Sequence, residues 1–326
     1  MRTVWLRFSV SILLTIVVIS GILLLSHPER LNKLTITKED GHSTEGLWKA
    51  PDSTTMPMEK LGKEIRYGKK LIANTARYLG PKGSVLQISN GMNCQNCHLN
   101  AGTKPFGNNY GSVASMYPRF RARSGSLESI EKRVNDCIER SLNGKKLDSL
   151  SMEMKSMVAY IKWVGKDLPK GRKAKGSGLF DIAYLPRRAD TLTGRSLYAS
   201  KCAICHGYKG EGLRRMDGVD YVYPPLWGEN SFNVSAGLFR ISNFANYIFT
   251  NMPQGATYDK PVLTEVEAWD IAAYVVSRPR PAKKFEADWP KIETKPVDYP
   301  FGPYADTFTD AQHKYGPFQP ILESLK

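Results

Sequence analysis

Two short strings in this sequence each combine two cysteines with a histidine: Cys94-Gln95-Asn96-Cys97-His98 and Cys202-Ala203-Ile204-Cys205-His206. Two thiols three positions apart can attach a haem through two thioether bonds, while the adjacent imidazole binds the iron. A structural zinc site would need a suitable partner pair, and a redox-active cysteine pair or a disulfide needs no histidine. The two strings therefore predict two covalently bound haem c groups, with His98 and His206 as the proximal iron ligands.

The segments around the two strings repeat along the chain. The interval from Cys94 to Cys202 is nearly the same as the interval between Tyr160 and Tyr274, two tyrosines of the expected closing helices. Apolar periodicity predicts a helix over 64–78 before the first string, and closing helices over 149–164 and 263–276. A helix, a Cys-x-x-Cys-His string, an irregular loop and a closing helix resemble a class I cytochrome c domain.

The expected fold is therefore all-α, with two tandem class I cytochrome c domains, an N-terminal hydrophobic helix and an irregular C-terminal tail packed on the domains. Two domains also fit a chain of 326 residues, at roughly 150 residues a domain. The expected segments are a signal peptide or signal anchor at 1–25, a spacer at 26–58, cytochrome c domain 1 at 59–165, a linker at 166–190, cytochrome c domain 2 at 191–282 and a wrapping tail at 283–326.

Each iron needs a second axial ligand, and the other three histidines are badly placed to supply it. His27 and His42 lie in the N-terminal spacer, and His313 lies near the C-terminus. In class I domains the second ligand comes from the loop shortly before the closing helix. Met252 has this position relative to Tyr274. We therefore predict His/Met ligation of the second haem; the alternative is a loop methionine in the core.

The same count back from Tyr160 leads to a cysteine. Cys137, the fifth of five, precedes Tyr160 by almost the interval that separates Met252 from Tyr274, whereas Met116 lies too far upstream. A lone cysteine is commonly a buried structural thiol, but the repeat favours Cys137 as the distal ligand. A thiolate lowers a haem's potential and a methionine raises it. Because a thiolate is also a nucleophile exposed to oxidation, it favours an enzyme over a pure electron carrier.

Positive charge is concentrated around Cys137. The chain has a net charge of +15, and more than half of it falls within the stretch 119–175 around this cysteine. If 126–142 forms one helix, Arg133 and Ser141 share the face of Cys137. A solvated basic face explains most of these residues. For Arg123 and Arg133 we favour the binding of an oxyanion, which pairs well with guanidinium.

The N-terminus resembles an export signal. Arg2 and Arg7 precede an uncharged run over 8–25, whose length is at the lower limit for a membrane-spanning helix. The positive-inside rule then places the bulk of the chain in the periplasm. Since no convincing cleavage site follows, we expect residues 8–25 to tether the chain to the inner membrane, with cleavage as the alternative. Export removes nucleic acid as a partner, and no nucleic-acid-binding motif is recognised.

Together these features resemble the dihaem thiosulfate dehydrogenases over roughly residues 60 to 320. The resemblance is most specific around Cys137. The segments that carry it are Arg121-Ala122-Arg123-Ser124-Gly125, Arg133-Val134-Asn135-Asp136-Cys137-Ile138-Glu139-Arg140-Ser141-Leu142-Asn143-Gly144, Asn251-Met252-Pro253, Pro300-Phe301-Gly302-Pro303-Tyr304 and His313-Lys314-Tyr315-Gly316-Pro317-Phe318.

The family resemblance implies oxidative coupling of two thiosulfates to tetrathionate, with release of two electrons. Some members run mainly as tetrathionate reductases, and the sequence leaves the direction open. The resemblance implies His98 and Cys137 as ligands of a catalytic haem, and His206 and Met252 as ligands of an electron-transfer haem. Electrons are then relayed to or from a soluble cytochrome c or another periplasmic carrier.

The resemblance also implies that Arg133, Ser141 and Arg123 hold the substrate. Some members have a lysine before the distal methionine as an alternate ligand, whereas this chain has Asn251, which argues against such an exchange. Two other functions are compatible with two haem strings. The first is a non-catalytic dihaem electron-transfer protein; the second, a dihaem peroxidase, is disfavoured by the placement of the spare histidines.

Overall fold

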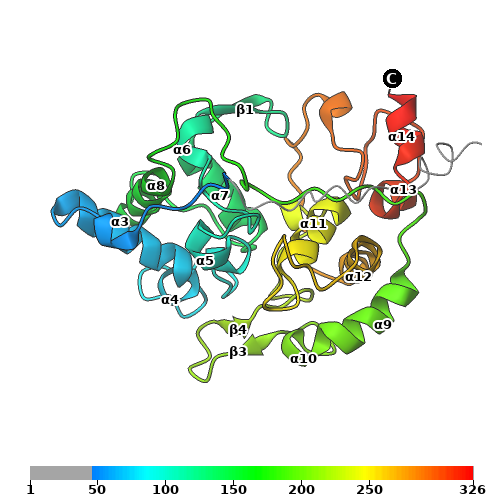
Figure 1. Cartoon of the computed structure of the whole chain (residues 1–326), viewed down its shortest axis with the longest axis horizontal. Helices are drawn as coiled ribbons and strands as arrows, with labels where there is room; N and C mark the ends of the chain where they lie inside the picture. Colours follow the sequence, from blue (N-terminus) through cyan, green and yellow to red (C-terminus); the bar gives the residue numbers. More distant parts are fainter. Residues whose placement is uncertain (1–45, 326) are drawn as a thin grey trace, which may run out of the picture. The chain divides into compact units, whose positions relative to one another are not determined.

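The computed structural model of the chain describes residues 46–325 (Figure 1). The expected signal or anchor over 8–25, together with His27 and His42, lies outside the described residues. Within the described range, no helix has both the length and the apolar character needed to cross a membrane.

The first repeat is built of helices and one hairpin. Its elements are η1 (Ser53–Thr55), α3 (Lys60–Ala73), α4 (Thr75–Leu79), η2 (Cys94–Asn96), α5 (Leu99–Gly102), α6 (Val113–Met116), β1 (Arg119–Arg121), β2 (Ser126–Glu128), α7 (Ile130–Arg140) and α8 (Met152–Val164).

The second repeat and the tail follow. Their elements are α9 (Thr191–Lys201), α10 (Ala203–His206), β3 (Leu213–Arg214), β4 (Tyr221–Tyr223), η3 (Gly237–Phe239), α11 (Ile241–Asn251), α12 (Glu265–Ser277), η4 (Ile292–Thr294), α13 (Asp310–Tyr315) and α14 (Gln319–Ser324).

The same helix crossing builds both repeats. Gly68 of α3 lies so close to α8 that a Cβ atom there would be 1.9 Å from a backbone oxygen of α8. Gly194 of α9 approaches α12 equally closely, again with 1.9 Å to a backbone oxygen. A residue with a side chain could not occupy either position without moving the helices apart. Tyr160 and Tyr274 contact the glycine of their own repeat, in agreement with the alignment made from the sequence.

Two segments differ from the helices predicted for them. Residues 64–78 form two helices, because Asn74 between them leaves the helical conformation with φ −129° and ψ 43°. Residues 126–142 were treated as one helix for the comparison of Arg133, Cys137 and Ser141, but they begin as strand β2, which pairs with β1. Helix α7 starts only after Ser129, whose side chain accepts a hydrogen bond from the backbone N–H of Lys132 at 3.2 Å and so caps it.

Two short antiparallel hairpins are the exceptions to the expected all-helical fold. Strands β1 and β2 form one hairpin, and β3 and β4 form the other. Arg123 lies in the turn between β1 and β2. The hairpin therefore presents this arginine from a different element than the helix that carries Arg133 and Cys137.

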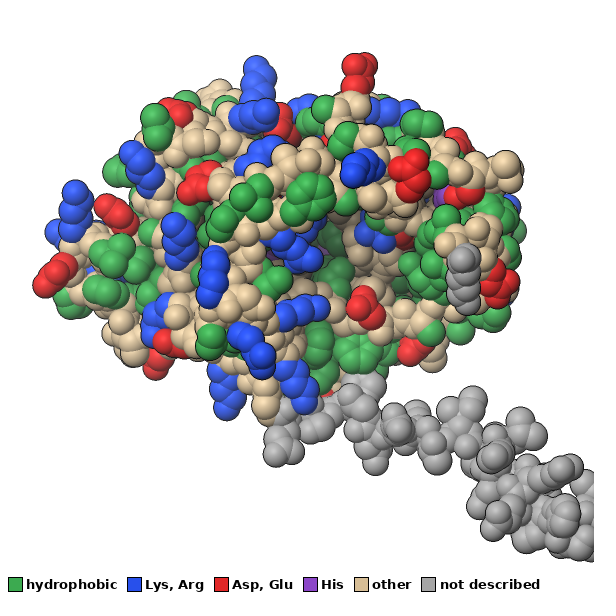
Figure 2. All heavy atoms as spheres, turned by 90° about the horizontal axis from the view of Figure 1, so that it is seen from above, with side chains coloured by type: hydrophobic (Ala, Val, Ile, Leu, Met, Phe, Trp, Pro, Cys, Tyr) green, Lys and Arg blue, Asp and Glu red, His purple; other side chains and the backbone are tan. Residues whose placement is uncertain are grey.

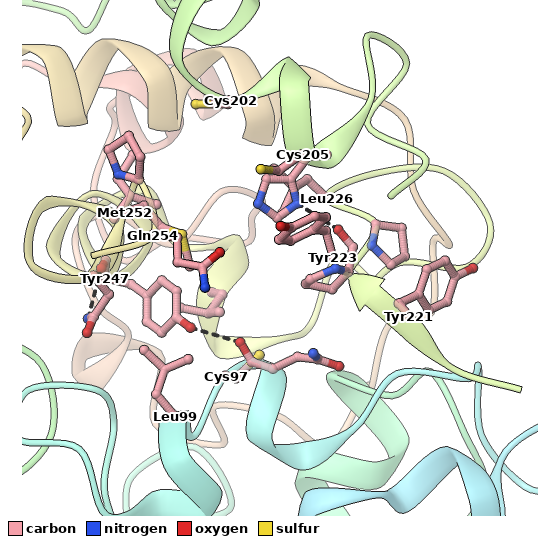
Figure 3. Close-up of a pocket in the computed structure, with 18 of the residues that line it drawn as sticks. Cys97, Leu99, Cys202, Cys205, Tyr221, Tyr223, Leu226, Tyr247, Met252 and Gln254 are labelled. Atoms are coloured by element: carbon pink, nitrogen blue, oxygen red, sulfur yellow. Dashed lines mark hydrogen bonds between the residues drawn. The ribbon is translucent and has the colours of Figure 1, made fainter. Parts of the chain in front are cut away.

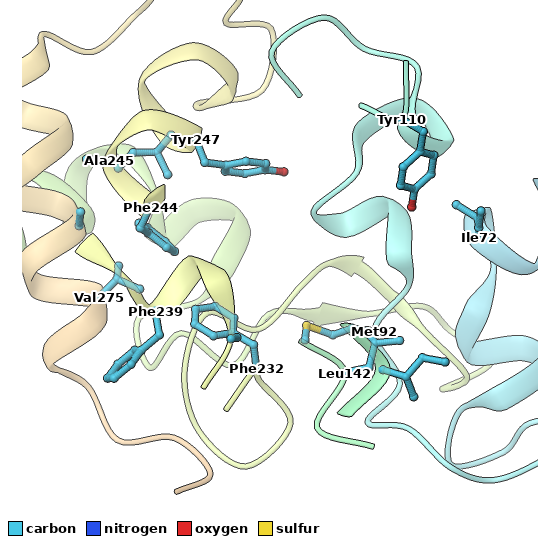
Figure 4. Packing of buried hydrophobic residues seen from close by; sticks show 14 of the residues in the cluster. Ile72, Met92, Tyr110, Leu142, Phe232, Phe239, Phe244, Ala245, Tyr247 and Val275 are labelled. Carbon is cyan, nitrogen blue, oxygen red and sulfur yellow. The ribbon is translucent and has the colours of Figure 1, made fainter. Parts of the chain in front are cut away.

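Buried asparagines join the two repeats. The Asn233 amide donates to the Glu139 carbonyl oxygen at 2.9 Å and to Asn143 Oδ1 at 3.0 Å. From the other side, the Asn93 amide donates to Asp220 Oδ2 at 3.1 Å. An unpaired buried amide would be unfavourable, so these bonds fix the contact between the repeats. The buried hydrophobic residues also form one cluster through both of them (Figure 4).

The tail packs on both repeats. Asp288 accepts two hydrogen bonds from Arg140 of α7, at 2.7 and 2.8 Å. Further along the tail, the fully buried Asp298 accepts from Arg240 Nε at 2.8 Å, next to the start of α11. Bidentate and buried carboxylate pairs of this kind hold a chain segment in one geometry.

Candidate functional site

The first cysteine–histidine string holds its imidazole in a fixed orientation. The Nδ1 atom of His98 lies 2.5 Å from the Asn108 carbonyl oxygen and donates to it. The ring stacks on Tyr110, with the centroids 4.7 Å apart. A ligating histidine commonly donates its other N–H to such a carbonyl. Nε2 of His98 is thus the ring nitrogen that remains for the Cys137 side chain or for a metal.

Cys137 and His98 lie together although they are far apart in the sequence. Cys137 is in the last turn of α7, and its sulfur interacts with the His98 side chain. Burial raises the pKa of Cys137, but the charge of Arg133 and the contact with His98 outweigh this and bring the pKa to about 7. The thiolate is therefore more accessible at Cys137 than at an ordinary cysteine.

Three of the four cysteines in the strings have the opposite electrostatic setting. Burial raises the pKa of Cys94 to about 11, of Cys97 to about 12 and of Cys202 to about 11. Neutral thiols are poor nucleophiles and poor metal ligands. The described surroundings thus distinguish Cys137 from these three cysteines.

Ser141 lies one turn beyond Cys137. It follows the last residue of α7, and its backbone N–H donates to the Cys137 carbonyl oxygen at 2.8 Å. Residues four apart on a helix lie on one face. The shorter helix of the structure therefore still brings Arg133, Cys137 and Ser141 to the same side.

Arg123 reaches this region from the β1–β2 turn. Its guanidinium lies over the rings of Trp289 and Tyr299, at 5.4 and 5.9 Å from their centroids. Burial lowers the pKa of Arg123 to about 10, and the charges of Arg140 and Arg133 contribute to this. Three guanidinium groups therefore lie within electrostatic reach of one another.

Asp288 neutralises one of the three, Arg140. Neither Arg123 nor Arg133 forms an ion pair with a carboxylate among residues 46–325, and the Cys137 sulfur raises the pKa of Arg133. Figure 2 views the molecule from the side of the hairpin and shows Lys and Arg side chains around and within a hollow. Two guanidinium groups without carboxylate partners suit an oxyanion.

The second string opens onto a cavity of about 510 Å³ (Figure 3). Cys202, Cys205, His206 and Met252 line it together, so the structure unites the four residues predicted for the second haem. His206 Nδ1 contacts the Pro224 carbonyl oxygen at 2.8 Å, which again leaves Nε2 for a metal.

The remaining walls of this cavity are largely apolar, with Phe232, Phe244 and Val275 among them. Two thiols, an imidazole, a thioether and apolar walls are the donor set and surroundings that a haem c needs. The residues present therefore fit this cofactor. Asn251, next to Met252, turns its amide elsewhere and donates to the Phe106 carbonyl oxygen at 3.1 Å.

Several neighbours of the site had no signal in the sequence. Tyr110 stacks on His98, and Tyr247 donates to the carbonyl oxygen of Asn96, inside the first string, at 2.8 Å. Figure 3 shows this bond at the edge of the second cavity. Trp289 and Tyr299 come from the tail. Its aromatic composition is visible in the sequence, but the contact with Arg123 depends on how the chain returns to the first repeat.

Two known families match the chain. Residues 86–169 match "SoxA/TsdA, cytochrome c domain", and residues 189–275 match "Cytochrome C oxidase, cbb3-type, subunit III". The haem-type strings and these matches define a c-type cytochrome with two cytochrome c domains.

The curated relatives identify the family. The thiosulfate dehydrogenase of Psychrobacter arcticus is 37% identical over 262 residues, which are 79% of this chain and 77% of the relative. That of Allochromatium vinosum is 35% identical over 235 residues, 71% of this chain and 83% of the relative. The chain belongs to the thiosulfate dehydrogenase family, as its sequence motifs indicated, and is an oxidoreductase that acts on sulfur compounds.

A solved structure agrees with this conclusion. Thiosulfate dehydrogenase (TsdBA) of Marichromatium purpuratum superposes with a TM-score of 0.68 at 29% identity and covers 83% of this chain. The present chain spans 54% of that longer protein.

Proposed function

We propose that this protein interconverts thiosulfate and tetrathionate in the periplasm, according to 2 thiosulfate = tetrathionate + 2 electrons. The observation that carries the proposal is the contact between Cys137 and His98, with the half-buried Arg133 beside the sulfur. An iron-binding pair of imidazole and thiolate would thus lie directly beside groups that attract sulfur oxyanions.

The arginines reduce the main electrostatic obstacle of this reaction, which is the repulsion between two thiosulfate dianions. At 4 Å, two unit charges repel by about 4 kcal/mol at an effective dielectric constant of 20, and two thiosulfates carry two charges each. Arg123 and Arg133 hold the sulfonate groups and reduce this repulsion, while Ser141 offers a further hydrogen bond. The two sulfane sulfurs are thereby brought together near Cys137, where one sulfur–sulfur bond forms.

Two haem c groups fit the two strings, attached at Cys94 and Cys97 and at Cys202 and Cys205. When bound, they supply the redox chemistry: they accept the two electrons of the coupling reaction or donate them in reverse. His98 and Cys137 hold the first iron.

The second iron is held by His206 and Met252. The partner is a soluble cytochrome c or another periplasmic electron carrier. A tether to the inner membrane through residues 8–25 remains part of the proposal.

The alternative function was a dihaem electron carrier without substrate chemistry. The relatives named thiosulfate dehydrogenase favour the enzyme. A direct test adds thiosulfate to the oxidised, haem-loaded protein and follows haem reduction in the visible spectrum. We expect thiosulfate-dependent reduction and, in low-spin electron paramagnetic resonance, one His/thiolate and one His/Met signal. Two His/Met signals and no thiosulfate-dependent reduction would contradict the proposal and support the electron carrier without substrate chemistry.

A further inference from the structure

A buried arginine next to the second cavity lacks partners for part of its guanidinium group. Arg280 follows α12 and is only 8% exposed. Its Nη2 atom donates to the Val275 carbonyl oxygen at 2.8 Å. Nε and Nη1 are buried and have no hydrogen-bond partner within the described residues. Buried guanidinium donors are rarely left unpaired, because the loss of water is not compensated.

The surroundings of this guanidinium group are apolar and positively charged. It lies over the rings of Phe232 and Phe239, at 4.3 and 4.9 Å from their centroids. Lys314 of α13 approaches Phe239 as well, at 5.4 Å from the ring. Burial lowers the pKa of Arg280 to about 9, and after burial the charge of Arg280 is the next cause that lowers the pKa of Lys314. Two cations in one apolar site require an anion nearby.

The cavity provides the place for that anion. Phe232 and Val275, two of the residues that Arg280 contacts, also line the cavity with Cys202 and Met252. Figure 4 shows Phe232, Phe239 and Val275 gathered on the side of the second repeat. A haem is apolar except for its two propionate carboxylates. Its apolar ring suits the lining of the cavity, whereas its carboxylates need donors such as those that Arg280 has free.

We infer that Arg280 binds a propionate carboxylate of the haem held by Cys202 and Cys205, and that Lys314 adds positive charge to the same site. The C-terminal tail, through α13, thereby takes part in binding the cofactor of the second repeat. This inference rests on the second haem of the proposed function, but it is independent of thiosulfate turnover.

The pairing has a consequence for the haem potential. A cation beside a carboxylate lowers the carboxylate's pKa, so the propionate stays ionised and neutralised near neutral pH. Without Arg280, the propionate pKa rises. Above that pKa the uncompensated negative charge stabilises the ferric haem and lowers the potential. Below it the protonated propionate restores the potential. The charged neighbours to consider are Lys314, opposite Arg280, and Arg278 on the same segment.

The test compares Arg280→Met with Arg278→Met in the full, haem-loaded chain. Arg278 is exposed, lies on the same segment, and is placed over Tyr274 at 5.4 Å from the ring, which makes it a matched control. The measurement is a spectroscopic redox titration of the His/Met haem between pH 5 and 9. We expect Arg280→Met to lower the potential at high pH and to make it pH-dependent, and Arg278→Met to match the parent protein. Parent-like behaviour of Arg280→Met, or an equal change in both variants, overturns the inference.

Arg280→Lys covers the case in which Arg280→Met does not fold. This variant keeps the charge but changes the hydrogen bond, so we expect a near-parental potential with a shifted propionate bending band in resonance Raman spectra. An unshifted band contradicts the inference. Thiosulfate-dependent reduction of the parent protein is measured separately, so failure here is distinguishable from failure of the proposed function.

Discussion

The two repeats share one framework and differ in what they place opposite the cysteine–histidine string. Gly68 and Gly194 allow the same close helix crossing. In each repeat the histidine of the string is oriented by a contact between its Nδ1 atom and a backbone carbonyl oxygen further along the chain. The residue that we propose as the distal ligand lies within helix α7 in the first repeat (Cys137) and directly after helix α11 in the second (Met252). The comparison teaches that the shared helix crossing and cysteine–histidine string set the position of an iron. The segment opposite the string, which carries Cys137 or Met252, sets the chemistry available to that iron.

The charges around Cys137 and around Met252 also differ between the two repeats. Arg133 of α7 lies beside Cys137, and Arg123 of the β1–β2 turn lies within electrostatic reach of Arg133. Around Met252, the walls are largely apolar, and we inferred above that the nearby Arg280, which lies over Phe232, binds the cofactor rather than a substrate. A substrate anion is thus favoured in the first repeat, and electron transfer without substrate is favoured in the second.

Replacing Cys137 by Met removes the difference between the distal ligands and has the largest expected effect. We expect both haems to remain attached, the first haem's potential to rise, and thiosulfate turnover to fall on the order of 10³-fold or more, as for loss of a nucleophile. Haem content, potential and steady-state turnover are measured on one preparation. Normal turnover in this variant would mean that the sulfur at position 137 has no part in catalysis.

Replacing Arg133 by Met tests the charge beside the sulfur. Because charge-assisted hydrogen bonds to an oxyanion are strong, we expect kcat/KM for thiosulfate to fall roughly 10²-fold. Arg119→Met is the control, since Arg119 is exposed on β1 and its replacement removes the same charge from the same repeat. An equal loss of kcat/KM in both variants would show that the overall positive charge of this repeat attracts the substrate, and would contradict a specific contact with Arg133.

The sequence predicted the repeat better than the local elements. The spacing of Tyr160 and Tyr274 could be compared between the repeats because the glycine-mediated helix crossing is the same in both, and Cys137 and Met252 stay predicted ligands. The start of α7 was wrong, since residues 126–128 pair with 119–121, and strand pairing depends on a partner outside the local sequence. The same limit applies to Trp289, because its contact with Arg123 forms only when the tail packs on the first repeat, which the local sequence does not show.

The two glycines of the framework permit a test of how far the repeats are alike. A Cβ atom at Gly68 or Gly194 would collide with helix backbone, so Ala at either position should lower the free energy of unfolding by about 2 kcal/mol. Gly237→Ala is the control, because nothing lies within 4 Å of a Cβ there. Denaturant unfolding followed by circular dichroism measures the effect. We expect one shared transition, since buried asparagines join the repeats, and two separate transitions would contradict this coupling.

The smallest expected effect concerns the junction of the repeats. Tyr247 of α11 lines the second cavity and donates to the Asn96 carbonyl oxygen at 2.8 Å. Burial raises the pKa of Tyr247, so its hydroxyl remains a donor at every working pH. Tyr247→Phe keeps the ring but leaves that carbonyl without this donor. We expect it to lower the free energy of unfolding by about 1 kcal/mol.

Because the bond ties the first string to the wall of the second cavity, we also expect Tyr247→Phe to slow electron exchange between the two haems by less than about tenfold, the factor that about 1.4 kcal/mol represents. Flash reduction of one haem, followed by its re-equilibration with the other, measures this rate. Tyr67→Phe is the control, because that hydroxyl donates to Glu153 at 3.0 Å within the first repeat. An equal slowing in both variants would show that the contact at Asn96 does not set the distance between the two sites.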